Sequence, residues 1–125
     1  MLANFANEIQ FVGRLLLGGA FVVAGSRNAM NAGFLTGLMA AKNVPMPRTA
    51  LWVGIFFQLL GAIGLVFGPY TMWAGLALIL FIITATVIFH NFYGLQGPER
   101  VAEINAVISN TALVGGLLVI VATAM

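Results

Sequence analysis

Residues 49–89 read TALWVGIFFQLLGAIGLVFGPYTMWAGLALILFIITATVIF and contain no charged side chain. A helix needs about 20 mostly apolar residues to cross the hydrocarbon core of a bilayer, which is about 30 Å thick. The run is therefore too long for one crossing and has the right length for two. Gly68 and Pro69 stand in its middle. Because proline cannot donate the backbone hydrogen bond of a continuing helix, we expect two antiparallel spans joined there.

The rest of the chain has the same apolar character. Of its 125 residues, 62% are hydrophobic and 6% are charged, and the mean hydropathy is +1.08. A soluble domain carries charge at about a quarter of its positions. Four spans are predicted in all, at about residues 9–26, 50–67, 71–91 and 104–124. Because backbone groups in hydrocarbon must bond within their own helix, these stretches predict an all-α four-helix transmembrane bundle that forms a single membrane domain.

Two connectors differ from a simple loop. Residues 31–43 contain an apolar helical stripe that is too short to cross, made of Phe34, Leu35, Leu38 and Met39. We therefore expect a short interfacial helix between the first two spans. Residues 91–103, which contain Gly97 and Pro98, predict a polar, solvated connector before the fourth span. The first and third connectors carry more Lys and Arg than the tails, which favours termini outside the cytoplasm.

Composition excludes several classes of function. The chain has no cysteine, so it forms no disulfide and holds no thiolate-ligated iron–sulfur cluster. His90 is the single histidine, and we expect neither haem nor a metal site, and no covalent cofactor. The net charge of +2 is scattered along the chain and does not indicate a nucleic-acid partner.

Two polar side chains lie inside the predicted spans. A charge in hydrocarbon costs at least about 2.5 kcal/mol, so Arg14 should face the bundle interior. It shares a helical face with Gly18 and Gly25, whose small size lets another backbone approach closely. Gln58 has a similar small-residue face around Gly61. We predict that Arg14 and Gln58 are neighbours near mid-membrane. The alternative interpretation is structural, with both side chains only bonding each other and backbone carbonyl groups.

Further polar residues gather near the ends of spans. His90 ends the third span and Asn110 lies in the fourth. The antiparallel order places both on the side where the first span ends at Arg27, so we expect these three residues to converge at one mouth of the bundle, with residues 31–43 above them. Such side chains suit a neutral head group with carbonyl or hydroxyl oxygens. The alternative for His90 is an interfacial residue without a ligand. The candidate pocket for a quinone or lipid head group consists of Arg14, Gln58, His90, Asn110 and Arg27, and none is assigned to catalysis.

Blocks of sequence along nearly the whole chain resemble those of the DoxX family. They are GRLLLG at residues 13–18, FVVAG at 21–25, QLLG at 58–61, ATVIFH at 85–90 and NTALVGGLL at 110–118. The resemblance implies a four-helix membrane protein. It also implies, as in some members, the membrane part of a thiosulfate:quinone oxidoreductase or a link to redox-stress complexes. Gln58 stands where members often carry an acidic residue and Ser109 where a Lys is common, so we expect a quinone or lipid pocket rather than thiosulfate oxidation.

The resemblance and the interior polar residues lead to one expected function and two alternatives. We expect a quinone- or lipid-associated membrane subunit of an oxidoreductase complex in the bacterial inner (cytoplasmic) membrane. The first alternative is a non-catalytic accessory or assembly subunit of a larger membrane complex. The second is a small multidrug-type transporter, which is disfavoured because no carboxylate lies deep in the spans. The expected partners are membrane lipids and either other membrane subunits or further copies of the chain.

Overall fold

The computed structural model describes residues 2–67, 69–90 and 94–125. In these ranges the regular elements are the short 3-10 helix η1 (Leu2–Phe5) and the helices α1 (Ala6–Met30), α2 (Ala32–Ala41), α3 (Pro47–Val66), α4 (Thr71–Phe89) and α5 (Gly97–Thr123). By length and composition, α1, α3, α4 and α5 can each cross a membrane. The predicted all-α fold, with four spans and a short helix between the first two, is confirmed.

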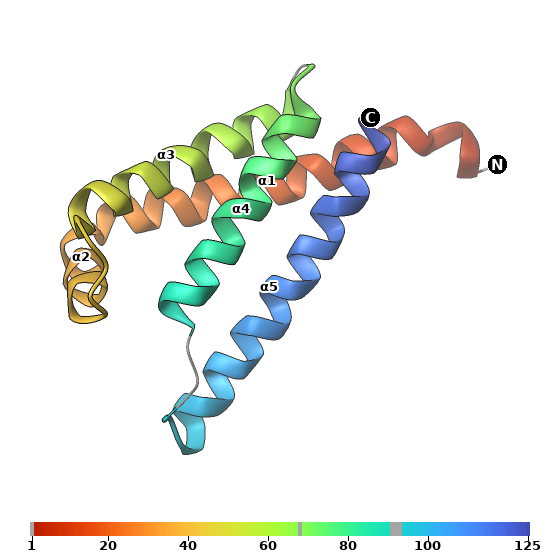
Figure 1. Cartoon of the computed structure of the whole chain (residues 1–125). Coiled ribbons are helices and arrows are strands. Elements are labelled where there is room, and N and C mark those ends of the chain that lie inside the picture. The colour runs from red at the N-terminus through yellow and green to blue at the C-terminus, as the bar shows by residue number, and fades with distance from the viewer. Residues whose placement is uncertain (1, 68, 91–93) are drawn as a thin grey trace.

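The four long helices pack in the order α1, α3, α4, α5, each mainly against the next. Figure 1 shows α3 running beside α1, while α4 diverges from α3 below their connection. The helix α5 runs beside α4 in the opposite direction. The connection is short, since α3 ends at Val66 and α4 begins at Thr71. The first residue after α3, Phe67, is extended. Gly68, half of the predicted break, lies outside the described residues. We refer to this end of the bundle as the hairpin end.

Glycines allow the helices to touch near the hairpin end. A Cβ atom on Gly18 would lie 2.9 Å from the carbonyl oxygen of Ala62, so α1 and α3 meet almost backbone to backbone. A Cβ atom on Gly75 would lie 2.7 Å from Cγ2 of Val121, which places α5 equally close to α4. The prediction that Gly18 lets another helix approach α1 closely is confirmed.

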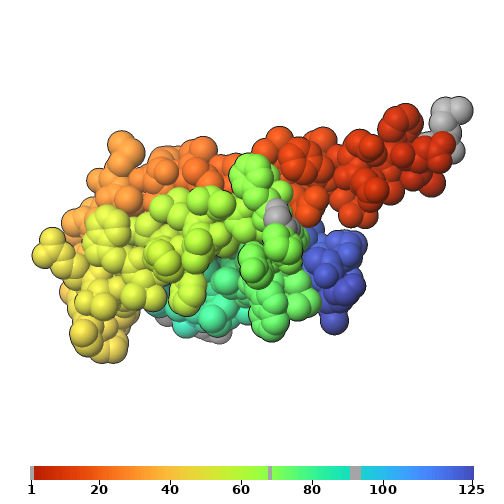
Figure 2. All heavy atoms as spheres, turned by 90° about the horizontal axis from the view of Figure 1, so that it is seen from above, coloured from red at the N-terminus to blue at the C-terminus, as the bar shows by residue number. Residues whose placement is uncertain are grey.

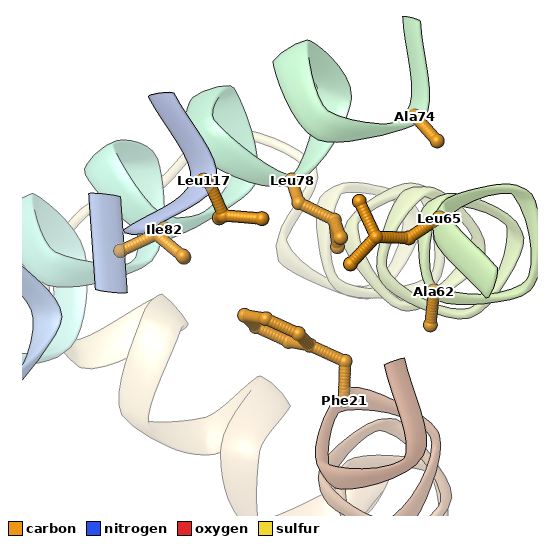
Figure 3. Close-up of a cluster of buried hydrophobic side chains, with 7 residues drawn as sticks. All are labelled: Phe21, Ala62, Leu65, Ala74, Leu78, Ile82 and Leu117. Carbon is orange, nitrogen blue, oxygen red and sulfur yellow. The ribbon is translucent and has the colours of Figure 1, made fainter. Parts of the chain in front are cut away.

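A cluster of buried apolar side chains joins all four long helices. Its members are Phe21, Ala62, Leu65, Ala74, Leu78, Ile82 and Leu117. Figure 3 shows the ring of Phe21 pointing from α1 toward the side chains of the other helices. Because lipid tails are as apolar as leucine, the close packing of these side chains holds the helices together more than their removal from water does.

The last helix differs from the prediction at its start. The predicted polar connector reaches residue 103, but α5 begins at Gly97 and has Pro98 in its first turn. Proline is favoured there because the first N–H groups of a helix have no helical partner and its φ angle suits the helix. Glu99 and Glu103 therefore lie on a helix, and residues 91–93 of the predicted connector lie outside the described residues.

The short helix α2 packs against α3. Met39 is 3% exposed and forms a second buried cluster with Leu51 and Ile55 of α3. Phe34, assigned to the same apolar stripe by the sequence, is 70% exposed. Only part of the predicted stripe is therefore in contact with the bundle, while Phe34 faces outward.

Candidate binding cavity

A cavity of about 730 Å³ lies between the helices at the end opposite the hairpin. Near the hairpin end, Gly61 of α3 packs directly on Leu78 of α4. Farther along α3, Leu51 and Ile55 instead pack on Met39 of α2. The diverging helices α3 and α4 thus leave a space, and α2 closes one side of it. We call this end of the bundle the cavity end.

The wall of the cavity is mostly apolar, and part of it lies on the outer surface of the bundle. Val53 and Phe57 of α3 and Leu80 of α4 line the cavity and are 49%, 42% and 60% exposed. In a membrane this outer surface faces lipid. An apolar molecule therefore has a lateral route from the bilayer into the cavity.

One interhelical hydrogen bond lies within the cavity wall. Gln58 of α3 is 2% exposed, and its Oε1 accepts a hydrogen bond of 3.0 Å from Nδ2 of Asn28 in α1. Gln58 faces the interior, as predicted, but sequence reasoning did not select Asn28. The signal was present, because Phe21, Gly25 and Asn28 follow the i, i+4, i+7 spacing of one helix face.

Two polar pairs join α4 to α5 beside the cavity. Nδ1 of His90 lies 2.8 Å from Oε2 of Glu103, and Nδ2 of Asn110 donates to Oγ1 of Thr86 at 2.9 Å. Thr86 and His90 are four residues apart at the end of α4, and Glu103 and Asn110 are seven apart on α5. Each of these spacings keeps two residues on one helix face, so the two pairs lie one above the other. The side chains of His90 and Glu103 are 32% and 29% exposed, which places this pair at the edge of the bundle.

Lys42 fastens the end of α2 to the end of α4. Its Nζ donates a hydrogen bond of 2.7 Å to the carbonyl oxygen of Ile88 and lies 6.0 Å from the centre of the Phe89 ring. Ile88 belongs to the last turn of α4, whose carbonyl groups lack helical partners and attract cations. Because Leu35 and Met39 of α2 line the cavity, this bond helps to hold a covering helix in place.

Comparison with known proteins places the chain in a family. A family model for DoxX matches residues 9–91, more than half of the chain. The chain belongs to the DoxX family. With its four apolar helices, this DoxX protein is an integral membrane protein. No curated protein and no solved structure matches it. Glu103 and Asn110 lie on α5, beyond the matched residues.

Arg14 does not line the cavity of this DoxX protein. Its Nη1 lies 3.4 Å from Oγ1 of Thr71, at the hairpin end, and its Nε is buried without a hydrogen-bond partner among the described residues. Gln58 instead contacts α1 at Gly25, about 16 Å along the helix from Arg14 at about 1.5 Å per residue. The prediction that Arg14 and Gln58 are neighbours is wrong.

The register of two antiparallel helices explains this error. Gly18 lies opposite Ala62, so Gln58, four residues before Ala62, meets the part of α1 that follows Gly18. Arg27 is also absent from the cavity wall. It is exposed, and its carbonyl oxygen accepts a 2.9 Å hydrogen bond from Nδ2 of Asn31. The predicted mouth therefore contains His90 and Asn110 without Arg27.

Proposed function

We propose that this DoxX protein binds the head group of a quinone in its cavity and serves as a membrane subunit of an oxidoreductase complex in the bacterial cytoplasmic membrane. The observation that carries the proposal is the cavity, which has apolar walls, lining residues on the lipid-facing surface, and the polar residues Asn28, Gln58, His90 and Asn110. A lipid-soluble molecule with a polar head matches all three features.

Size and shape support this ligand class. Small-molecule sites in proteins typically enclose about 300 to 1,000 Å³, and the cavity encloses about 730 Å³. The apolar walls suit a ring with an alkyl or isoprenoid tail. The opening at Val53, Phe57 and Leu80 lets such a tail extend into the bilayer.

The polar groups suit the carbonyl oxygens of a quinone. Each Asn or Gln amide carries two N–H groups. Asn28 donates one to Gln58, and Asn110 donates one to Thr86. Each donor amide has a second N–H, and Gln58 contributes its own NH₂ group. A bound quinone would supply electron-accepting chemistry, while the residues of this chain bind and orient it; we propose that a partner subunit provides the electrons.

Lipid extraction tests the proposal. The protein is purified from native membranes in mild detergent, and quinones are quantified by mass spectrometry per mole of protein. We expect about one quinone per chain, and about fivefold less in Gln58→Leu, the loss that about 1 kcal/mol of hydrogen bonding produces. Arg27→Gln is the control because Arg27 lies outside the cavity, and it should retain the quinone. Phospholipid without quinone in the extract, or equal quinone in Gln58→Leu, would contradict the proposal.

The first half of α1 favours a second candidate function, that of an assembly subunit. Figure 2 shows the N-terminal part of the chain projecting beyond the other helices. Its apolar side chains are exposed, with Phe5 at 54%, Ile9 at 57% and Leu16 at 69%. Native mass spectrometry of membrane extracts tests this function. A different membrane protein that is released by Leu16→Gln would support it, and recovery of the chain alone or only with its own copies would count against it.

A further inference from the structure

We propose that His90 and Glu103 make the cavity selective for a head group that bears a hydroxyl group, because Glu103 fixes His90 as a hydrogen-bond acceptor. This inference rests on the proposed function, since it specifies the chemistry of the head group that the same cavity binds. Its ligand class is a hydroxyl-bearing amphiphile, such as a quinol or a lipid alcohol.

His90 lies between the cavity and the edge of the bundle. It lines the cavity, whereas Glu103, which is hydrogen-bonded to its Nδ1, does not. The backbone N–H of His90 donates a 3.0 Å hydrogen bond to the carbonyl oxygen of Thr86. The ring is therefore anchored through its backbone on α4 and through its Nδ1 on α5. The remaining ring nitrogen, Nε2, is the one that we propose contacts a ligand.

The hydrogen-bond partner of Nδ1 determines whether Nε2 donates or accepts a hydrogen bond. An ionised carboxylate only accepts hydrogen bonds, so the nitrogen that faces Glu103 carries the proton. In a neutral ring the other nitrogen, Nε2, then has a free lone pair and accepts a hydrogen bond. Glu103 thus acts as a positioning residue, in the same way that carboxylates orient metal-binding histidines.

This acceptor complements the amides of the cavity. Asn28, Gln58 and Asn110 supply N–H donors, which pair with carbonyl or ether oxygens. Nε2 of His90 instead accepts a hydrogen bond from a hydroxyl group. A ligand in which the hydroxyl is methylated leaves Nε2 unpaired, and we expect it to bind about two- to tenfold more weakly, the range that one hydrogen bond produces.

Nuclear magnetic resonance tests the positioning role without any ligand. His90 is the single histidine of the chain, so the protein labelled with ¹⁵N-histidine and purified through a histidine-free tag gives one imidazole signal set. At a pH at which the ¹⁵N shifts show a neutral ring, we expect the proton on Nδ1. Glu103→Leu should shift it to Nε2, while Glu103→Gln, which still offers an acceptor oxygen, should retain it on Nδ1.

Glu99→Leu is the matched control, because Glu99 is an exposed carboxylate one turn earlier on α5. It should leave the proton on Nδ1. A proton on Nε2 in the unaltered protein, or the same tautomer in Glu103→Leu as in the unaltered protein, would overturn the inference.

Probe binding in nanodiscs tests the selectivity. The probes are 4-decylphenol, its methyl ether 4-decylanisole and decanol, with affinities expressed per mole fraction of probe in the lipid and read from the imidazole signals. We expect the phenol to bind about two- to tenfold more tightly than the ether, and Glu103→Leu to remove this difference. Decanol separates the two sources of the hydroxyl: preference for the phenol indicates a quinol, the reduced form of the quinone, whereas equal binding of decanol and phenol indicates a lipid alcohol, which keeps the hydroxyl selectivity and contradicts the quinone of the proposed function.

The outcomes separate this inference from the proposed function. Equal binding of phenol and ether overturns the hydroxyl selectivity alone, because a ligand still occupies the cavity. Failure of every probe to bind the unaltered protein overturns both.

Discussion

The two ends of the bundle use the same helices in different ways. At the hairpin end, Gly18, Gly61 and Gly75 bring neighbouring helices into direct contact. At the cavity end, α3 and α4 separate, and Gln58 and His90 border the space between them. The charged Arg14 lies at the tightly packed end, whereas neutral amides line the cavity. Helix separation, more than the charge of a residue within a span, therefore decides where the bundle leaves a cavity.

The largest expected effect, on the free energy of unfolding, comes from disrupting the close helix contact at the hairpin end. Gly18→Val places its Cβ atom 2.9 Å from the backbone oxygen of Ala62, which cannot move aside as a side chain can. We expect a loss of at least about 2 kcal/mol in the free energy of unfolding, measured by SDS titration in mixed micelles. Gly19→Val is the control, because a Cβ atom on Gly19 meets no atom within 4 Å. Equal stability of the two variants would contradict the close contact.

A smaller effect is expected from the polar pair of the cavity end. A double-mutant cycle of Asn28→Leu and Gln58→Leu should give a coupling energy of about 0.6 to 1.7 kcal/mol, as measured for hydrogen bonds between membrane helices. The same cycle with Asn105→Leu, an exposed residue of α5, in place of Asn28→Leu should give no coupling. Additive effects of the Asn28 and Gln58 substitutions would mean that the bond does not form.

The smallest expected effect concerns α2, the helix that closes one side of the cavity. Lys42→Met removes the hydrogen bond to Ile88, and we expect the amide hydrogens of α2 to exchange about twofold faster, which corresponds to about 0.5 kcal/mol. Arg48→Met is the control, because Arg48 is exposed and outside the cavity. If both variants exchanged at the rate of the unaltered protein, Lys42 would have no role in holding α2.

The spans could be predicted from sequence because the hydrocarbon acts on each helix separately. Residues 49–89 had to form two spans, since their length and lack of charge leave no other arrangement in lipid. The same reasoning placed Gln58 in the interior, because an amide within an apolar span is costly unless it bonds to a neighbouring helix. Both predictions depend on local sequence alone.

The partners of the polar residues could not be predicted in the same way. They depend on helix register, and the contact of Gly18 with Ala62 cannot be distinguished in sequence from other glycine contacts. Glu103 was missed as the partner of His90 because Gly97 and Pro98 suggested a loop, although a proline also suits the first turn of a helix.

Photoaffinity labelling with an azido-quinone in native membranes tests most directly whether the cavity end is the binding end. We expect adducts on residues 53–58 of α3 and on residues 80–90, at the end of α4, which excess unlabelled quinone suppresses, and none on residues 61–75 at the hairpin end. Adducts spread evenly over the lipid-facing surfaces of both ends, and unaffected by unlabelled quinone, would contradict a binding role for the cavity.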